Sequence, residues 1–408
     1  MEQAPSPATR HAMELWGHVE QILPRVIAIR RDLHTHPELA YQERRTASVV
    51  ESVLRELGLE IRTGVARTGV IGLLRGARPG RTLALRADMD ALPMDDQLRA
   101  PYASTVPGAA HKCGHDAHTA MLLGTAMILS SLRSYLAGNV KFLFEPAEEI
   151  LGTDLKPGAQ LMVEEGALDD PKVDAVIGCH VFPEYPSGRI ALRAGPVMTG
   201  TDLLDITIIG KESHTATPEK GVDAIVVAAH VLSALQILVS REASPTGSLV
   251  VHIGTIHGGR ARNILADRVE MTGSVRTSDL SLRPKLHERI ERVVSGVAQS
   301  MRASYELRYI GNYLPAVVND PQITQLVAEA ARGVLGEERV IWLPQPRLAG
   351  ESFFNYSERV PSTFWFLGTG NPTKGTDLPS HHPRFDIDEE AMATGMAVFC
   401  NCCLTWLA

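Results

Sequence analysis

Short apolar runs of strand length alternate with longer helical patterns along the first 180 residues, and this alternation restricts the fold most. Residues 69–74 (GVIGLL), 82–87 (TLALRA), 140–145 (VKFLFE) and 173–180 (VDAVIGCH) are strand-like, whereas 118–132 (HTAMLLGTAMILSSL) has the length of a helix. Strands that alternate with helices favour a mainly parallel sheet covered on both faces. The sequence therefore predicts an α/β fold.

The middle of the chain changes to a different order of elements. The pattern reads strand 203–210, helix 222–236, strands 248–256 and 268–277, helix 282–299 and strand 304–310. This βαββαβ order is that of a ferredoxin-like α+β unit. Because helical patterns return afterwards, we expect one domain built from residues 1–198 and 313–408, with residues 199–312 inserted between its two parts.

Composition and charge exclude several classes of protein. The net charge is −7, from 40 Lys and Arg against 47 Asp and Glu, and the chain has no long basic run, so we expect no nucleic-acid partner. We find no apolar run of about 18 residues and expect no membrane partner.

Cysteine usage and the N-terminus bear on the compartment. Five cysteines, an odd number in a long chain, argue against a disulfide framework and favour the cytoplasm. The N-terminal MEQAPSPATR has no apolar signal core. A periplasmic or secreted location stays open if this end is a processed one.

Ligand-type side chains crowd into residues 111–120 (HKCGHDAHTA), between a predicted strand and a predicted helix. Sites in open α/β sheets gather beyond the carboxyl ends of the strands, where this connection is expected to lie. Cys113 and His115 stand out, because thiolate and imidazole are good ligands for zinc and similar metals. Two ligands do not complete a site.

Other predicted strands end in further candidate ligands. Glu148 and Glu149 follow one strand, His180 ends another, and His381 and His382 come late in the chain. One glutamate, His180 and one late histidine would complete a mixed sulfur, nitrogen and oxygen site. Adjacent glutamates also suit metal-assisted hydrolysis, in which one carboxylate holds the ion and its neighbour accepts a proton from the attacking water.

The chain resembles the metal-dependent amidohydrolases of the aminoacylase and carboxypeptidase superfamily. The branch most similar to it holds hippurate hydrolases and indole-acetyl-amino-acid hydrolases. The resemblance runs in order from about residue 25 to 395 and is carried by RRDLHTHPELAYQE, LRADMDALPM, KCGHDAHTAMLLGTA, FEPAEE, GCHVFPEYPSG, GKESHTATPEKGVDAI, GGRARNILAD and SHHPRFDID. It implies a zinc-peptidase-like catalytic domain with an inserted lid domain that also forms a homodimer.

The resemblance also implies roles for single residues. The ligands of one or two divalent ions (zinc, manganese, nickel or cobalt) would be Cys113, His115, Glu149, His180 and His381. Glu148 matches the general base, and Asp90 matches a residue that supports the ligands from behind. Asp116 could give the same support or bridge a second ion. His382 receives no ligand role, and we interpret His118 as a residue that shapes the loop.

The inserted domain is expected to contribute the groups that contact the substrate. His214 matches a histidine that polarises the scissile carbonyl, which dimeric relatives supply across subunits. Asn263 and Arg276 match positions that could hold a substrate carboxylate, although Arg276 could equally be a surface charge. The chain departs from the usual pattern at Ser213, Ala224, Ser352 and Glu145, which leaves the ligands intact but puts substrate preference in doubt.

The predicted function is metal-dependent hydrolysis of the amide bond of an N-acyl amino acid or a similar small conjugate. A dipeptidase or carboxypeptidase of the same superfamily is the alternative. Two other classes compete. Cys113 could be the nucleophile of a thiol hydrolase, or the site could bind a metal without catalysis. A thiol hydrolase would leave the glutamate pair, His180 and His381 without a role. A non-catalytic metal-binding protein would have no need of Glu148.

Overall fold

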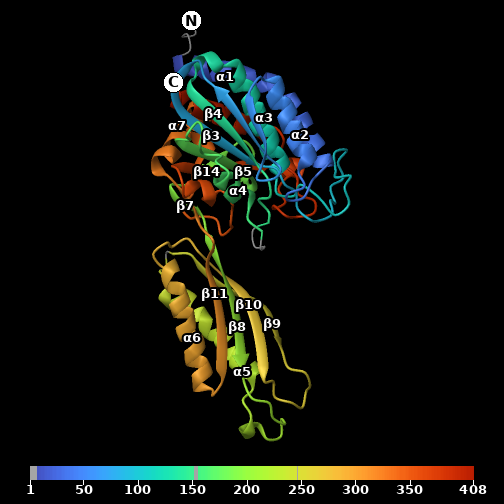
Figure 1. The fold of residues 1–408 in the computed structure, drawn as a ribbon, viewed down its shortest axis with the longest axis vertical. Coiled ribbons are helices and arrows are strands. Elements are labelled where there is room, and N and C mark those ends of the chain that lie inside the picture. The colour runs from blue at the N-terminus through green and yellow to red at the C-terminus, as the bar shows by residue number, and fades with distance from the viewer. Residues whose placement is uncertain (1–6, 151–154, 246) are drawn as a thin grey trace. The chain divides into compact units, whose positions relative to one another are not determined.

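The structure is a computed structural model that describes residues 7–150, 155–245 and 247–408. It consists of two compact units (Figure 1). Unit 1 takes residues up to Val197 together with Val318–Gln345 and Glu351–Ala408, and unit 2 takes Met198–Val317 and Pro346–Gly350. The first six residues of the N-terminal stretch considered above lie outside the described residues, and Pro7 begins the first helix.

Unit 1 is built on an eight-stranded sheet of order β1-β2-β4-β3-β5-β14-β6-β13. The pairs β3/β4, β3/β5, β5/β14 and β6/β13 are parallel, and β1/β2, β2/β4 and β14/β6 are antiparallel. The predicted mainly parallel sheet is therefore confirmed. The strands are β1 (Glu60–Val65), β2 (Gly69–Arg75), β3 (Arg78–Asp88), β4 (Ala137–Glu145), β5 (Ala175–Pro186), β6 (Ile190–Leu192), β13 (Val340–Trp342) and β14 (Ser362–Gly370).

Helices cover both faces of this sheet. The core of one face joins Leu85, Ile177 and Trp365 of the strands to five helices, α1 (Pro7–Thr35), α2 (Arg44–Glu56), α3 (His115–Ser131), α7 (Pro321–Leu335) and α9 (Ala391–Trp406). The other two α-helices of unit 1 among the described residues are α4 (Gly158–Glu164) and α8 (Phe354–Ser357). Phe353, just before α8, lies so close to β5 that a Cβ on Gly178 would be 2.6 Å from its ring. Only glycine allows that approach.

The first helix is longer than its sequence pattern suggests. The apolar pattern alone predicts a helix over residues 18–33 in which Pro24 is tolerable only near the first turn, but α1 begins at Pro7 and Pro24 lies inside it. Proline removes one intrahelical hydrogen bond at that point. Burial of Leu15, Val19 and Val26 in the core of unit 1 outweighs the lost bond, which is why packing and not local propensity sets the helix length.

Unit 2 has the predicted βαββαβ order. Its sheet is antiparallel and ordered β11-β8-β10-β9, with a core between the sheet and two helices. In chain order the elements are β8 (Gly200–Ile209), α5 (Ala224–Ile237), β9 (Leu249–Gly258), β10 (Arg268–Thr277), α6 (Leu286–Ser300) and β11 (Ser304–Leu314). A separate two-stranded sheet pairs β7 (Gly195–Met198) with β12 (Val317–Asn319).

Helix α5 is apolar on nearly all sides. Val227, Val231 and Leu235 are buried in unit 2, whereas Ile225 and Ile237 are nearly half exposed. Together with the turn that follows it, the helical segment Ala224–Glu242 is long and apolar enough to cross a membrane by length and composition alone. The expectation that no such stretch exists is therefore wrong. One face of this segment belongs to the core of unit 2, and the opposite apolar face has no cover within the part of the chain that the structure describes.

Candidate metal centre

The candidate site lies where neighbouring strands of unit 1 end. Asp88 is the last residue of β3 and pairs with Glu145, the last residue of β4, after which the chain turns into Glu148 and Glu149. His180 lies on β5, the other neighbour of β3. His115 opens α3, and the glycine before it has φ +94°, where a Cβ would also collide with Val181 at 2.3 Å.

The structure brings all five predicted ligands together. The ligand atoms of Cys113, His115 and His180 lie within 4.8 Å of one another, as do those of Cys113, Glu149 and His381. Cys113 Sγ is 3.3 Å from His180 Nε2, and His381 Nε2 is 3.5 Å from Glu149 Oε1. The site therefore offers one thiol, three imidazoles and a carboxylate, a donor set that suits zinc and similar divalent ions.

Two of these ligand atoms lack any hydrogen-bond partner although they are buried. His115 Nε2 and Glu149 Oε1 accept and donate no hydrogen bond, and they lie 3.8 Å apart. A buried polar atom without a partner is costly, and two that converge on one point are rare in a stable protein. A divalent cation between them would satisfy both, so the residues present fit a metal ion.

Surrounding groups aim the ligand atoms. Asp90 Oδ1 is 3.2 Å from His115 Nδ1, and Asp90 Oδ2 accepts a hydrogen bond from the backbone N–H of Glu149 at 2.9 Å. His180 Nδ1 donates to the carbonyl of Val181 at 2.7 Å. In both histidines the Nδ1 contact turns Nε2 toward the site, which is the arrangement typical of metal-binding histidines. Asp90 thus has the contacts expected of the supporting residue.

His118 has no nitrogen left for a metal. Its Nδ1 lies 2.6 Å from Asp88 Oδ1, and its Nε2 accepts a hydrogen bond from the backbone N–H of Val181 at 2.9 Å. Both ring nitrogens are therefore used in holding α3 against β3 and β5. These contacts agree with the interpretation of His118 as a residue that shapes the loop.

Asp116 does not lie against the ligands. Its carboxylate is 2.8 Å from Arg30 Nε and 2.7 Å from His34 Nδ1, both on α1. Consecutive helix residues point about 100° apart, so when His115 faces the site its neighbour faces the adjoining helix. The expectation that Asp116 supports a ligand or bridges a second ion is corrected accordingly.

A buried cluster around Arg86 was not anticipated from the sequence. Its guanidinium is 2.8 Å from Glu145, 2.7 Å from Asp88 and 2.9 Å from Glu351, and it donates to Ser352 Oγ at 3.0 Å. The available signal was an arginine in the middle of an apolar strand run, because a buried charge requires buried partners. Glu145 and Ser352, two departures from the usual motif, meet each other and Arg86 in this cluster.

Glu148 lies between this cluster and the candidate ligands. It is buried, and its Oε1 accepts a hydrogen bond from the backbone N–H of Ser352 at 3.0 Å. Burial and the nearby carboxylates of Glu351 and Glu149 raise the pKa of Glu148 well above its usual range. A raised pKa makes this carboxylate a stronger proton acceptor, as a general base requires.

The loops that carry two site residues use an uncommon backbone conformation. Ala147, just before Glu148, has φ +52°, and His381 has φ +66°. Residues other than glycine seldom adopt this left-handed region and need support from their surroundings. Glu43 supplies it on one side by accepting the Ala147 N–H at 2.8 Å, and the carbonyl of Lys112 accepts the His381 N–H at 2.7 Å.

Of the three residues of unit 2 that were predicted to contact substrate, two are neighbours and the third lies apart from them. His214 forms a β-bridge with Ile264, and Asn263 accepts the N–H of Thr215 at 3.2 Å, so His214 and Asn263 are neighbours. Arg276 pairs with Thr201 at the opposite end of β10 from Arg268 and donates to the carbonyl of Leu348. His214 comes shortly after the end of β8 that pairs with Arg268. Arg276 lies eight residues farther along β10 than Arg268. At about 3.3 Å per residue this is roughly 25 Å.

Comparison with known proteins identifies the family. The family model described as peptidase family M20/M25/M40 matches residues 84–405. The chain belongs to this family. It is therefore a hydrolase that acts on amide bonds, and the resemblance inferred from the motifs is confirmed.

Similarity to individual proteins extends over nearly the whole chain. A probable hydrolase of Synechocystis is 42% identical over 94% of this chain and 96% of its own length. A thermostable carboxypeptidase of Saccharolobus solfataricus is 36% identical over 94% of this chain and 95% of its own length. An N-acyl-L-amino acid amidohydrolase of Geobacillus stearothermophilus is 42% identical over 74% of this chain and 80% of its own length.

A solved structure from the same family adds a metal-binding relative. This protein of Bacillus subtilis, described as a dinuclear metal-binding peptidase from the M20 family, is 35% identical to the present chain. The match has a TM-score of 0.81 and covers 95% of this chain and 99% of the other. The predicted fold class and the predicted need for divalent metal both agree with this relative.

Proposed function

We propose that the protein hydrolyses the amide bond of N-acyl amino acids or similar small conjugates, releasing a carboxylic acid and a free amino acid. The observation that carries the proposal is the convergence of Cys113, His115, Glu149, His180 and His381 beside the buried carboxylate of Glu148. The similarity to an N-acyl-L-amino acid amidohydrolase supports the choice of substrate.

The chain's own residues divide the chemistry among them. Cys113, His115, Glu149, His180 and His381 would hold one or two divalent ions of zinc, manganese, nickel or cobalt. Such an ion, when bound, polarises the substrate carbonyl and lowers the pKa of water. Glu148 would accept the proton of the attacking water and deliver it to the leaving nitrogen. The hydrogen bond from the Ser352 N–H fixes one oxygen of Glu148 for this transfer.

A thiol mechanism fits the same residues less well, although Cys113 and His180 are close. Burial and Glu149 raise the pKa of the Cys113 thiol, and burial and His118 lower the pKa of His180. This pair therefore favours a neutral thiol beside a neutral imidazole, whereas a nucleophilic cysteine needs a thiolate. Activity that survives a thiol alkylator but disappears with EDTA would separate the metal route from the thiol route.

A dipeptidase or carboxypeptidase is the second candidate, because the carboxypeptidase of Saccharolobus solfataricus covers almost the whole chain. The test is a screen of the purified, metal-analysed enzyme on N-acetyl, N-benzoyl and indole-acyl amino acids beside dipeptides and longer peptides. Higher kcat/KM on the N-acyl amino acids supports the first proposal. Turnover of peptides alone would replace it by the second.

We further propose that unit 2 acts as a lid and pairs two copies of the chain. The uncovered face of α5, with Ile225, Val226 and Ile237, lies on the same unit as the unpaired edge strand β9, which exposes Ile256. Apolar faces and free strand edges are usual contacts in symmetric dimers. The separation of His214 from Arg276 supports this arrangement, because one small substrate cannot contact both residues of the same copy.

The remaining parts of the proposal concern location and substrate contacts. All five cysteines are free thiols, which supports a reducing compartment such as the cytoplasm. Asn263 lies beside His214 and is proposed to assist it at the substrate carbonyl, whereas Arg276 is proposed to hold a substrate carboxylate from the other end of the sheet.

A further inference from the structure

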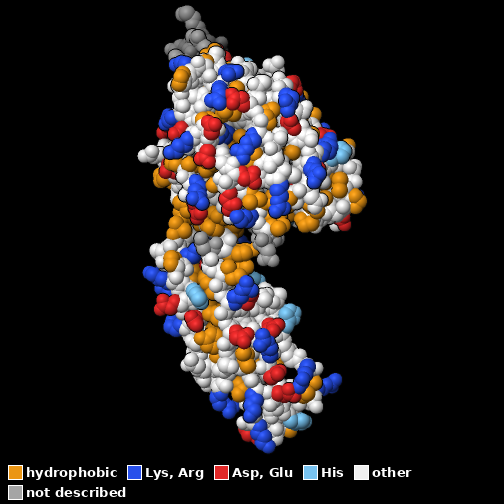
Figure 2. All heavy atoms as spheres, viewed as in Figure 1, with side chains coloured by type: hydrophobic (Ala, Val, Ile, Leu, Met, Phe, Trp, Pro, Cys, Tyr) orange, Lys and Arg blue, Asp and Glu red, His pale blue; other side chains and the backbone are white. Residues whose placement is uncertain are grey.

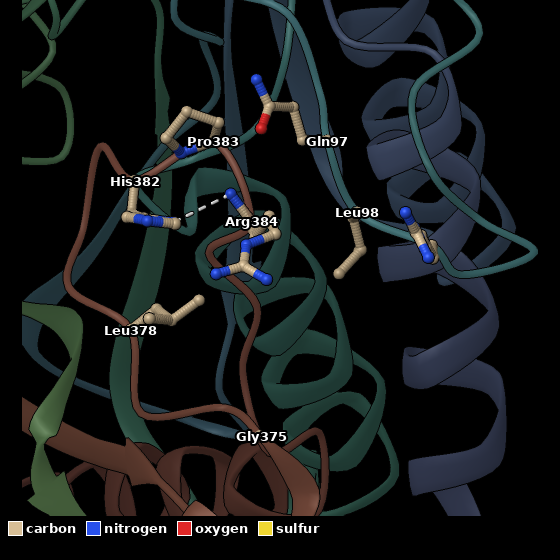
Figure 3. Close-up of a pocket in the computed structure, with 8 residues that line it drawn as sticks. Gln97, Leu98, Gly375, Leu378, His382, Pro383 and Arg384 are labelled. Atoms are coloured by element: carbon tan, nitrogen blue, oxygen red, sulfur yellow. Dashed lines mark hydrogen bonds between the residues drawn. The ribbon is translucent and has the colours of Figure 1, made fainter.

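A cavity lies in unit 1 next to His381 and is lined by residues that the proposed mechanism does not use. It has a volume of about 900 Å³ and is lined by Gln97, Leu98, Arg99, Leu378, His382 and Arg384, among other residues (Figure 3). Cavities of this size hold small-molecule ligands. The lining therefore decides what kind of ligand this cavity would accept.

The lining combines positive charge with a limited apolar surface. Arg99 and Arg384 contribute two guanidinium groups, and no carboxylate is among the described residues that line the cavity. In Figure 3 the Arg384 side chain is drawn between Leu98 and Leu378; both arginines are exposed, and the two leucines are half-buried. Guanidinium groups bind planar anions such as carboxylates through paired hydrogen bonds.

Within the described residues, no acidic side chain pairs with either of these two arginines, whereas several other arginines of unit 1 are paired. Arg25, Arg30, Arg45 and Arg86 each pair with an acidic side chain at 3.1 Å or less. For Arg99 and Arg384, no side-chain hydrogen bond or ion pair occurs within the ranges that the structure describes. The nearby Asp96 cannot neutralise them, because it is 2.6 Å from Lys112 Nζ and accepts the backbone N–H of Leu98 and Ser104.

The loops that carry the charges are held in place by their own hydrogen bonds. The N–H of Gln97 donates to the carbonyl of Pro383 at 2.9 Å and joins the two loops, and Asp96 fixes the start of the first. In the second loop, the N–H of Arg384 donates to His382 Nδ1 at 3.1 Å, the contact drawn in Figure 3. Because Nδ1 accepts, the ring proton of neutral His382 lies on Nε2, which adds a third donor to the lining.

The position of the cavity ties it to the candidate metal centre. His381 reaches toward Glu149 while the next residue, His382, lines the cavity. The left-handed backbone conformation of His381 lets its side chain reach the metal centre while the side chain of His382 lines the cavity. A substrate bound at the metal centre could therefore extend into this cavity from the same loop.

We infer that this cavity is a subsite for a negatively charged part of the substrate, with Arg99 and Arg384 binding a carboxylate and Leu98 and Leu378 contacting the carbon chain that carries it. The inference rests on the proposed function and adds a substrate class to it, namely N-acyl amino acids with a carboxylate beyond the scissile amide. That carboxylate could belong to a dicarboxylic acyl group or to the amino acid, and the experiment distinguishes the two.

The test compares substrates that differ by one charge at a time. Wild-type enzyme, Arg99→Gln, Arg384→Gln and the double variant are assayed on an N-succinyl amino acid, the matching N-acetyl amino acid and the C-terminal amide of each. Arg133→Gln is the matched control, because Arg133 is an exposed arginine outside the cavity. Metal content and thermal unfolding confirm that the variants remain loaded and folded.

The expected result is a loss of about 10- to 100-fold in kcat/KM for each arginine on the N-succinyl substrates, with little change on the N-acetyl substrates. A loss that instead follows the free α-carboxylate would assign the cavity to the amino-acid side of the substrate and would still support a carboxylate subsite. Equal activity of all variants on all four substrates would overturn the inference.

A separate binding measurement distinguishes failure of this inference from failure of the proposed function. If wild-type enzyme cleaves none of the amides, the proposed function is wrong, and the cavity is then tested by isothermal titration of the metal-loaded protein with N-succinyl-alanine and N-acetyl-alanine. Tighter binding of the succinyl compound that is lost in the double variant supports the subsite. Equal affinity of both proteins for both compounds overturns it.

Discussion

The backbone N–H of Ser352 donates to Glu148 Oε1 at 3.0 Å, and this bond links the proposed general base to the buried Arg86 cluster. The Ser352 hydroxyl bonds to Arg86 and to Glu145, and these two bonds fix the position of the Ser352 N–H. Ser352 is thus a positioning residue for Glu148.

Ser352→Ala is expected to lower kcat while leaving metal content unchanged, because the alanine keeps the N–H but loses the bonds that fix it. Removing a hydroxyl from a buried polar cluster also lowers the free energy of unfolding by about 1–3 kcal/mol. Steady-state kinetics and urea unfolding measure the two effects. Ser357→Ala on α8, whose hydroxyl bonds only to a carbonyl of its own helix, is the control. Wild-type kcat in Ser352→Ala would contradict the role.

The adjacent glutamates should fail in different ways. Glu149→Gln replaces a proposed ligand and is expected to lower bound metal, because an amide is a weaker ligand than a carboxylate. Glu148→Gln is expected to keep the metal and lose about 10²- to 10⁴-fold in kcat, the usual range for a general base. Elemental analysis beside kinetics separates the two losses. Equal metal loss in both variants would overturn the assignment.

Cys113→Ser is expected to reduce metal content and activity together, because the thiol is the softest of the five ligands and binds as a thiolate. Cys402→Ala is the matched control, since Cys402 is buried in α9 away from the site. The control should keep full metal. A Cys113→Ser protein with wild-type metal and turnover would remove Cys113 from the site.

Asp388 gives a pH-dependent contribution to stability. Burial alone would raise the pKa of Asp388, but hydrogen bonds from Asn371 and Lys374 outweigh burial and lower it. A carboxyl whose folded-state pKa is depressed stabilises the fold above its unfolded pKa of about 3.9 and loses that contribution as pH falls further. Wild type should therefore exceed Asp388→Asn in free energy of unfolding at pH 7, and the gap should shrink below about pH 4. Urea unfolding across this range checks the sign, and a gap independent of pH would contradict it.

Much of the fold could be predicted because its signals are local. Strand runs such as 140–145 and 173–180 correspond to β4 and β5, and the βαββαβ order of unit 2 follows from alternating patterns of strand and helix length. The gathering of Cys113, His180 and Glu149 was also predictable, since side chains that follow neighbouring parallel strands meet at one edge.

Other features depend on packing between distant segments, which local patterns do not contain. The direction of Asp116 depends on where α1 lies against α3, because Arg30 and His34 attract its carboxylate. The partners of Arg86 come from three separate parts of the chain, of which Glu351 is the most distant in sequence. The cavity beside His382 likewise needs two loops that are almost 300 residues apart in the chain.

The relation between His214 and Glu148 provides the test of the proposed dimer. His214→Ala should lower turnover and leave metal content unchanged, because this histidine is proposed to act only on the substrate oxygen. If His214 serves the active site of a partner, mixing His214→Ala with Glu148→Gln protein should restore some activity, since a mixed dimer contains one site with both residues intact. If it serves its own chain, mixing restores nothing.

Sedimentation at assay concentration decides how the mixing result applies. A dimer with restored activity supports the crossed arrangement, which the distance of roughly 25 Å between His214 and Arg276 within one copy also favours. A dimer without restoration would place His214 in its own site and leave Arg276 to the partner. A monomer that retains full activity would refute the proposed pairing through α5 and β9. Wild-type turnover in His214→Ala would exclude the histidine from catalysis in either arrangement.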